Sequence, residues 1–215
     1  MPNRFLAVPL LLVSWAVSLS GAEGDKLFFS RDFPGSVPEY FDVEVQADGK
    51  VVYRESLDDE LPIEFQAPDA DVSRLFEISE QLGYFEQPLA APKRKTAFTG
   101  DKILRYTTAA GASSQVEFIF ADDEAVQELT SWFVRVADTE WHRINIERAI
   151  QFDRLGVNKA ILQFHAAFER GRIVAPRQFL PLLQSISNDM KVVHLARSRA
   201  AGIAEQIEAG AVGGE

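Results

Sequence analysis

The chain has 215 residues, of which 47% are hydrophobic and 25% are charged, a balance typical of a folded globular protein and not of a disordered one. Its formal net charge of −10 repels phosphate backbones and anionic lipid, so no nucleic-acid partner is expected. The absence of cysteine excludes disulfides, thiolate metal ligands and cysteine nucleophiles.

The N-terminal segment has the pattern of a secretory signal peptide. Arg4 supplies a positive charge, residues 5–19 form an uncharged and mainly apolar run, and Ser20-Gly21-Ala22 provides small residues before Glu23. The run is shorter than the roughly 20 residues that span a bilayer. We therefore expect residues 1–22 to be a cleaved signal peptide, with the protein periplasmic or secreted and not stably inserted in the membrane afterwards. An uncleaved N-terminal anchor is the alternative.

Two strands joined by a tight turn are predicted next. Residues 40–46 alternate between apolar and polar side chains, and Asp48-Gly49 is a strong hairpin signal before a return strand at 50–55. We also expect an edge strand at 27–29 and a short strand at 61–66.

A helix and a second hairpin follow. The acidic residues within 68–71 suit a helix start, apolar residues recur at helical spacing as far as Leu82, and Gly83 fits the C-terminal cap. The strands of the second hairpin are predicted at 102–108 and 115–120.

The remainder of the chain has helical periodicity. Asp122 is expected to cap a helix that runs to Leu155, either as one helix or as two nearly collinear ones. Its apolar residues form one stripe as far as Val136 but cover several sides from Trp141 onward, including Phe152, which only a second layer of helices would bury. Further helices are expected at 157–169, from Pro176, and from Asn188 or Asp189 to about Glu208.

These elements predict an α+β fold: an antiparallel sheet of two hairpins with an intervening helix, followed by a C-terminal helical subdomain. The expected organisation after the signal peptide is a β-rich domain with one helix at 23–121, a helical region packed on it at 122–209, and a flexible tail at 210–215. Residues 23–121 carry a net charge of −9 and residues 140–199 a net charge of +5. This difference favours packing between the halves, although a basic face for a partner is an alternative.

No cofactor or metal motif is present, and none of the common nucleophile signatures occurs. The weak catalytic candidates are Asp138, His142 and Glu147. Asp138 and His142 stand four residues apart on a predicted helix, a spacing that suits an acid–base pair or a metal site, but more often gives an ordinary surface hydrogen bond. No cofactor and no metal are therefore predicted.

Three arginines are weak binding candidates: Arg143, Arg148 and Arg154. They could bind an anion in a cleft between the sheet and the helices. The more common alternative is a ladder of structural ion pairs along the helix, with Arg143 pairing with Glu147 at i, i+4.

Residues 40–137 resemble exported bacterial domains of unknown function. The resemblance rests on the strand and turn Asp48-Gly49-Lys50-Val51-Val52-Tyr53 and on a helix that ends in an aromatic pair, Tyr84-Phe85. It implies no activity and no catalytic residues.

The lack of a catalytic signature in a well-patterned fold predicts a non-catalytic binding or structural module, with another exported protein as its partner. Two alternatives stay open: a hydrolase that uses carboxylates and His142, and a carrier that holds a small ligand between the sheet and the long helix. The sequence does not determine the oligomeric state.

Overall fold

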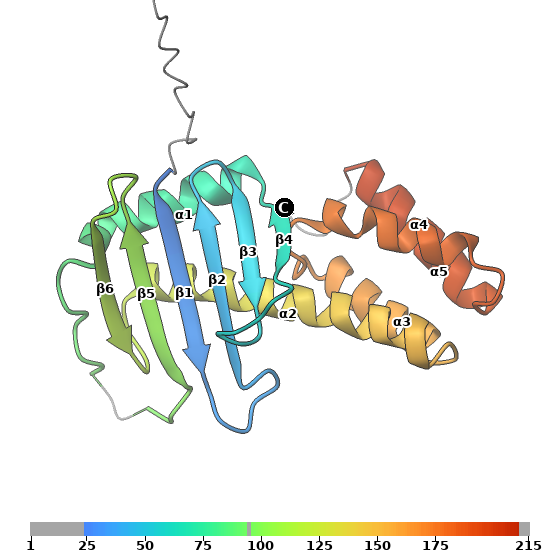
Figure 1. Cartoon of the computed structure of the whole chain (residues 1–215), viewed down its shortest axis with the longest axis horizontal. Coiled ribbons are helices and arrows are strands. Elements are labelled where there is room, and N and C mark those ends of the chain that lie inside the picture. Colours follow the sequence, from blue (N-terminus) through green and yellow to red (C-terminus); the bar gives the residue numbers. More distant parts are fainter. Residues whose placement is uncertain (1–23, 94–95, 211–215) are drawn as a thin grey trace, which may run out of the picture.

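The computed structural model describes residues 24–93 and 96–210, so the expected signal peptide and all but the first residue of the expected tail lie outside the described residues. The described part contains six strands and five α-helices, which confirms the α+β fold (Figure 1). The strands are β1 (Lys26–Asp32), β2 (Tyr40–Gln46), β3 (Lys50–Arg54), β4 (Ile63–Gln66), β5 (Asp101–Thr107) and β6 (Ser113–Phe118). The helices are α1 (Asp69–Gln81), α2 (Glu124–Phe152), α3 (Val157–Glu169), α4 (Leu180–Asn188) and α5 (His194–Glu208), with short 3-10 helices η1 (Gly83–Phe85) and η2 (Pro176–Phe179).

The six strands form one antiparallel sheet in the order β4-β3-β2-β1-β5-β6. The prediction of an edge strand at 27–29 was wrong, because β1 lies inside the sheet and pairs along its whole length with β2 and with β5. In this central position Leu27 and Phe29 are fully buried. The true edges are β4 and β6.

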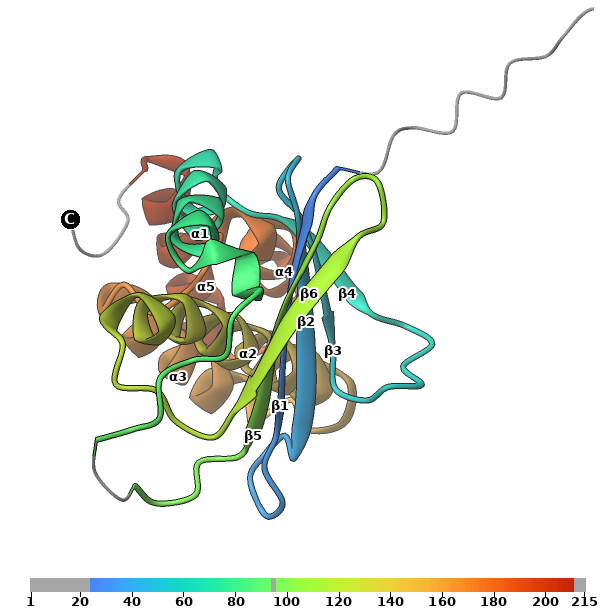
Figure 2. The same ribbon diagram turned by 90° about the vertical axis from the view of Figure 1, so that its left-hand side faces the viewer.

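One face of the sheet carries the first hydrophobic core, and Figure 2 shows the described helices gathered on that side. Phe29 of β1 stacks on Phe133 of α2 with 5.1 Å between the ring centroids. The strands contribute Val43, Val45, Val51 and Leu104 to this core, and α1 and α2 contribute Leu75, Ile78, Leu129 and Val136. The opposite sheet face carries polar side chains such as Glu44 together with apolar ones such as Phe28 and Val52.

Helix α2 is continuous over 29 residues and leaves the sheet to enter a second core, as predicted. Val136 belongs to the sheet core, whereas Ile146 belongs to the second core. The predicted N-cap was one residue early: the Asp123 carboxylate accepts the N–H groups of Ala125 and Val126. Asp122 instead accepts a hydrogen bond from a loop amide.

The second core lies between the end of α2 and helices α3, α4 and α5 (Figure 1). Phe164 and Phe179 pack at its centre with 4.4 Å between the ring centroids. The prediction that a second layer covers Phe152 and Leu155 was wrong, because these side chains are 77% and 80% exposed, at the last residue of α2 and in the turn that follows it. The last helix begins at His194, later than predicted.

None of the helices within residues 24–93 and 96–210 is long and apolar enough to cross a membrane.

Candidate functional site

Three surface hollows are the candidate sites. The sheet-face hollow lies over the polar face of the sheet, the His142 hollow lies between α2 and the end of α3, and the junction hollow lies between β4 and the helical subdomain. None of the three lies between the sheet and α2, where the Phe29–Phe133 stack fills the interface.

The sheet-face hollow encloses about 1110 Å³, and its walls include Tyr40, Asp42, Arg54 and Arg105. Arg54 Nη1 donates to Asp42 Oδ1 at 2.9 Å, and the Tyr40 hydroxyl donates to the same carboxylate at 3.1 Å. Burial raises the pKa of Asp42, and Arg54 opposes that change. The Arg105 guanidinium lies 4.8 Å from the centre of the Phe28 ring. Asp42, Arg54 and Arg105 are therefore engaged with groups of the same sheet.

The His142 hollow encloses about 640 Å³ and brings together two of the predicted catalytic candidates, Asp138 and His142. They share one side of α2 because residues four apart lie on the same face of a helix. Trp141, predicted as a core residue, is only partly buried and also borders this hollow. Glu147 is exposed further along α2 and does not border it, so the third candidate does not join the pair.

Burial shifts both groups of this pair towards their neutral forms. It raises the pKa of Asp138, opposed by His142, Arg31 and Arg172, and it lowers the pKa of His142, opposed by Asp138. Asp138 keeps solvent access, so the effect of burial on it is partial. The described contacts include neither a hydrogen bond nor an ion pair between the two side chains.

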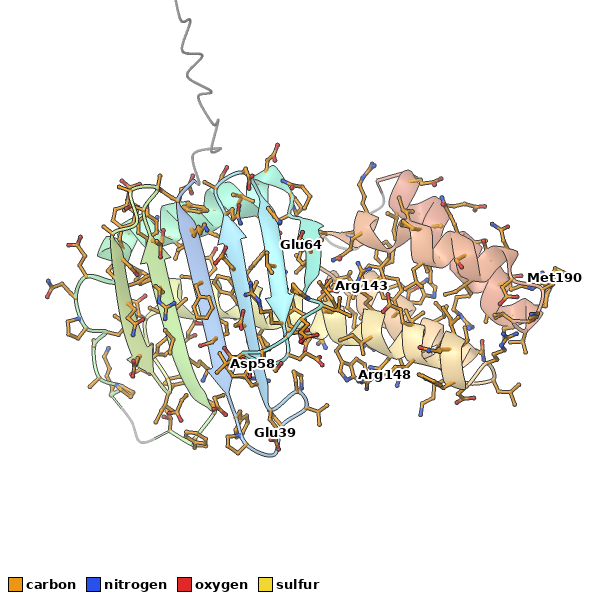
Figure 3. The ribbon with its side chains drawn as sticks, viewed as in Figure 1. Glu39, Asp58, Glu64, Arg143, Arg148 and Met190 are labelled. Atoms are coloured by element: carbon orange, nitrogen blue, oxygen red, sulfur yellow. The ribbon has the colours of Figure 1, made fainter. Side chains whose placement is uncertain are left out.

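The junction hollow encloses about 690 Å³ between the edge of the sheet and the helical subdomain. Its apolar walls include four buried residues: Phe65, Phe168, Ala175 and Ile207. Figure 3 shows Glu64 on β4 and Arg143 on α2 on the two sides of this junction. The exposed residues Glu64, Gln66 and Arg177 also line the hollow.

Arg143 organises the polar side of the junction. Its Nε donates to Glu140 Oε2 at 2.8 Å, and its Nη2 donates to Gln178 Oε1. Its guanidinium lies 5.1 Å from the centre of the Phe179 ring. Glu140 is fully buried, and burial raises the pKa of its carboxyl while Arg143 opposes the change. Arg143 thus holds a buried carboxylate and η2 in fixed positions.

The three predicted binding arginines do not form one site. Arg143 pairs with Glu140, and the predicted pair with Glu147 is not formed. Arg148 follows Arg143 by five residues, which places it about 140° around the helix, and it is exposed away from the junction (Figure 3). Arg154 is exposed in the turn after α2. The partners that matter for Arg143 include Gln178, 35 residues away, which no local spacing rule could identify.

Among residues 24–93 and 96–210, no group of three or more His, Asp or Glu side chains is arranged to hold a metal ion. Comparison with known proteins found no family model and no curated protein that matches the chain.

Proposed function

We propose that this protein is an exported, non-catalytic binding module that holds a partner in the junction hollow. The observation that carries the proposal is the apolar wall formed by Phe65, Phe168 and Ile207 between an exposed sheet edge and the helical subdomain. Concave sites with mostly apolar walls and a few polar groups are the usual form of a ligand site. Export is supported by the signal-peptide pattern of residues 1–22.

The polar groups of the junction suit binding better than proton transfer. Arg143 is held by Glu140 and Gln178, and Gln178 Nε2 donates to the carbonyl of Val174 at 3.2 Å. These bonds fix the shape of the hollow. Arg143 Nε, Arg143 Nη2 and Gln178 Nε2 are therefore engaged and form a rigid rim. Glu140 Oε1 has no hydrogen-bond partner among the described residues, but it is buried and does not line the hollow.

A capture experiment with two matched variants tests this function. The wild-type chain, Arg177→Glu and Arg170→Glu would each be used to capture proteins from the exported fraction of the source cells. Both variants change the net charge by the same amount at an exposed arginine, but Arg177 lines the junction hollow and Arg170 lines the His142 hollow. We expect a partner that Arg170→Glu retains and Arg177→Glu loses. Retention by both variants, or loss only with Arg170→Glu, would refute the junction as the site.

A hydrolase centred on the His142 hollow is the second candidate. It is favoured by one observation, the presence of Asp138 and His142 in the same hollow with pKa values shifted in opposite directions. Hydrolysis of p-nitrophenyl acetate and p-nitrophenyl phosphate would be compared for the wild type and His142→Asn. We expect no hydrolysis above the buffer rate. A rate that His142→Asn abolishes and Arg177→Glu preserves would favour the enzyme.

A further inference from the structure

We infer that the partner is an extended polypeptide segment that pairs with the free edge of β4 as an added strand, with its apolar side chains in the junction hollow and an acidic side chain beside Arg177. This inference rests on the proposed function and names the class of partner for the same site. It is carried by the register of β4, by the position of the hollow and by the charges around it.

The backbone of β4 directs half of its hydrogen-bonding groups away from the sheet. Ala67 N–H donates to the carbonyl of Gly49 at 2.9 Å, which fixes the register between β4 and β3. Hydrogen-bonded positions alternate along an antiparallel pair, so Phe65 also turns its N–H and C=O towards β3. Glu64 and Gln66 therefore direct theirs outward. Since β4 is an edge strand, these two donors and two acceptors are available to another chain.

The outward edge opens on the junction hollow, because Glu64 and Gln66 themselves line it. Side chains alternate between the two faces of a strand. An added strand would therefore turn every second side chain towards Phe168 and Ile207, where apolar groups fit, and the others towards the polar sheet face. The partner segment therefore needs apolar and polar side chains that alternate along its sequence. Pro62 and Pro68 lie just outside β4 and restrict the pairing to about four residues.

The charges around the hollow favour an acidic group on the partner. Glu64 forms an ion pair with Lys50 at 2.9 Å, and Arg143 forms one with the buried Glu140 at 2.8 Å. Arg177 is exposed, and no ion pair to it is present within residues 24–93 and 96–210. The surrounding residues 140–199 carry a net charge of +5. An acidic side chain close to Arg177 would complement this excess of positive charge.

The other sheet edge provides a matched control. The bond from Thr108 N–H to the carbonyl of Ala112 fixes the register of β6, and by the same alternation Gln115 directs its N–H outward. That edge lies beside η1, where the Ser114 hydroxyl donates to the carbonyl of Tyr84. Gln115→Pro therefore removes the same kind of outward N–H as Glu64→Pro, but away from the junction hollow.

The probe is the synthetic peptide Ac-Thr-Val-Thr-Val-Thr-Asp-Thr-NH2, in which both valines and the aspartate share one face of a strand. Its affinity for the full chain would be measured by calorimetry, and amide hydrogen exchange would be followed by NMR. We expect exchange at Glu64 and Gln66 to slow about tenfold or more on saturation, with Gln115 unchanged. Replacing aspartate by lysine in the peptide, or Glu64→Pro in the protein, should weaken binding about tenfold, whereas Gln115→Pro should not.

Two N-methylated peptides keep the test valid even if Glu64→Pro fails to fold. One is methylated on the valine and aspartate amides and the other on the threonine amides. Strand addition predicts that one of the two methylated peptides no longer binds. The other should keep a dissociation constant within about threefold of that of the unmodified peptide. Equal losses, or Glu64 and Gln66 amides that stay unprotected in the complex, would overturn strand addition and leave the junction site intact. No binding of the unmodified peptide would overturn the inference, while the capture experiment decides the proposed function separately.

Discussion

The carboxylate of Glu140 accepts a hydrogen bond from Arg143 Nε at 2.8 Å where α2 passes from the sheet core to the helical core. Ala137 belongs to the first core and Ile146 to the second, so this pair lies between them along the helix. Because Glu140 is fully buried, its charge depends on Arg143 for compensation. The pair therefore helps to position the helical subdomain relative to the sheet. It contributes in this way to the shape of the junction hollow.

Arg143→Ala should lower the free energy of unfolding by about 3–5 kcal/mol, because it leaves the Glu140 carboxylate buried without its cation. The double variant Glu140→Leu/Arg143→Leu should stay within about 1–2 kcal/mol of the wild type, since neither charge remains. Urea denaturation measures both values. Arg148→Ala, at an exposed position of the same helix, is the control and should change stability by less than about 0.5 kcal/mol. A loss below about 1 kcal/mol for Arg143→Ala would show that Glu140 does not depend on the pair.

Glu140 should also make stability depend on pH. Burial raises the pKa of its carboxyl above the ordinary 4.5, so the folded protein binds more protons than the unfolded chain above that pH. The stability of the wild type relative to Glu140→Gln should therefore fall as pH rises from about 4.5 through the folded pKa. Urea unfolding from pH 4 to 7 measures the difference. If the stability of the wild type relative to Glu140→Gln instead rises over this interval, the bond to Arg143 lowers the pKa of Glu140 more than burial raises it.

Several features of the fold were predictable because they depend on local patterns. Alternation identified β2, Asp48-Gly49 identified the turn into the return strand β3, and helical spacing identified α2 as a helix shared by two cores. The position of β1 was not predictable, because the order of strands depends on pairing between distant segments. Phe152 was wrongly expected to be buried, since the pattern shows which side chains are apolar but not which of them the other helices cover.

Phe133 and Phe152 should respond very differently to truncation, although both belong to α2. Phe133 is fully buried against Phe29, so Phe133→Ala should cost about 3–5 kcal/mol. Phe152 is 77% exposed, and Phe152→Ala should change stability by less than about 0.5 kcal/mol. Thermal or urea unfolding measures both. Similar losses for the two variants would mean that α2 is covered along its whole length.

Lys102 provides a second pH-dependent test. Its ammonium donates to the carbonyls of Thr99, Gly100 and Ile119, but burial, together with Arg31, lowers its pKa from 10.5 to about 8. Between pH 8 and 10.5 the unfolded chain keeps a proton that the folded protein has lost, so stability should rise with pH relative to Lys102→Met. A flat or falling difference would show that the hydrogen bonds hold the proton in spite of burial.

The candidate site was less predictable than the fold. Asp138 and His142 share a hollow because their spacing is local, and the sequence therefore indicated them together. The junction hollow combines β4 with residues from α2, α3, η2 and α5, which only tertiary packing brings together. Arg143 was identified as a binding candidate. Its partner Glu140 lies three residues away on the same helix, whereas its partner Gln178 depends on how η2 packs against α2.

Nitrogen-15 NMR of the full chain, titrated with the captured partner or with the synthetic peptide, would show directly whether the partner binds at the junction hollow. Binding at the junction should give the largest chemical-shift changes at Glu64, Gln66, Arg177 and Gln178, around the junction hollow. Changes centred on Tyr40 and Asp42 would instead place the partner on the sheet-face hollow, and changes centred on His142 would place it between α2 and α3. Either of these results would contradict binding at the junction.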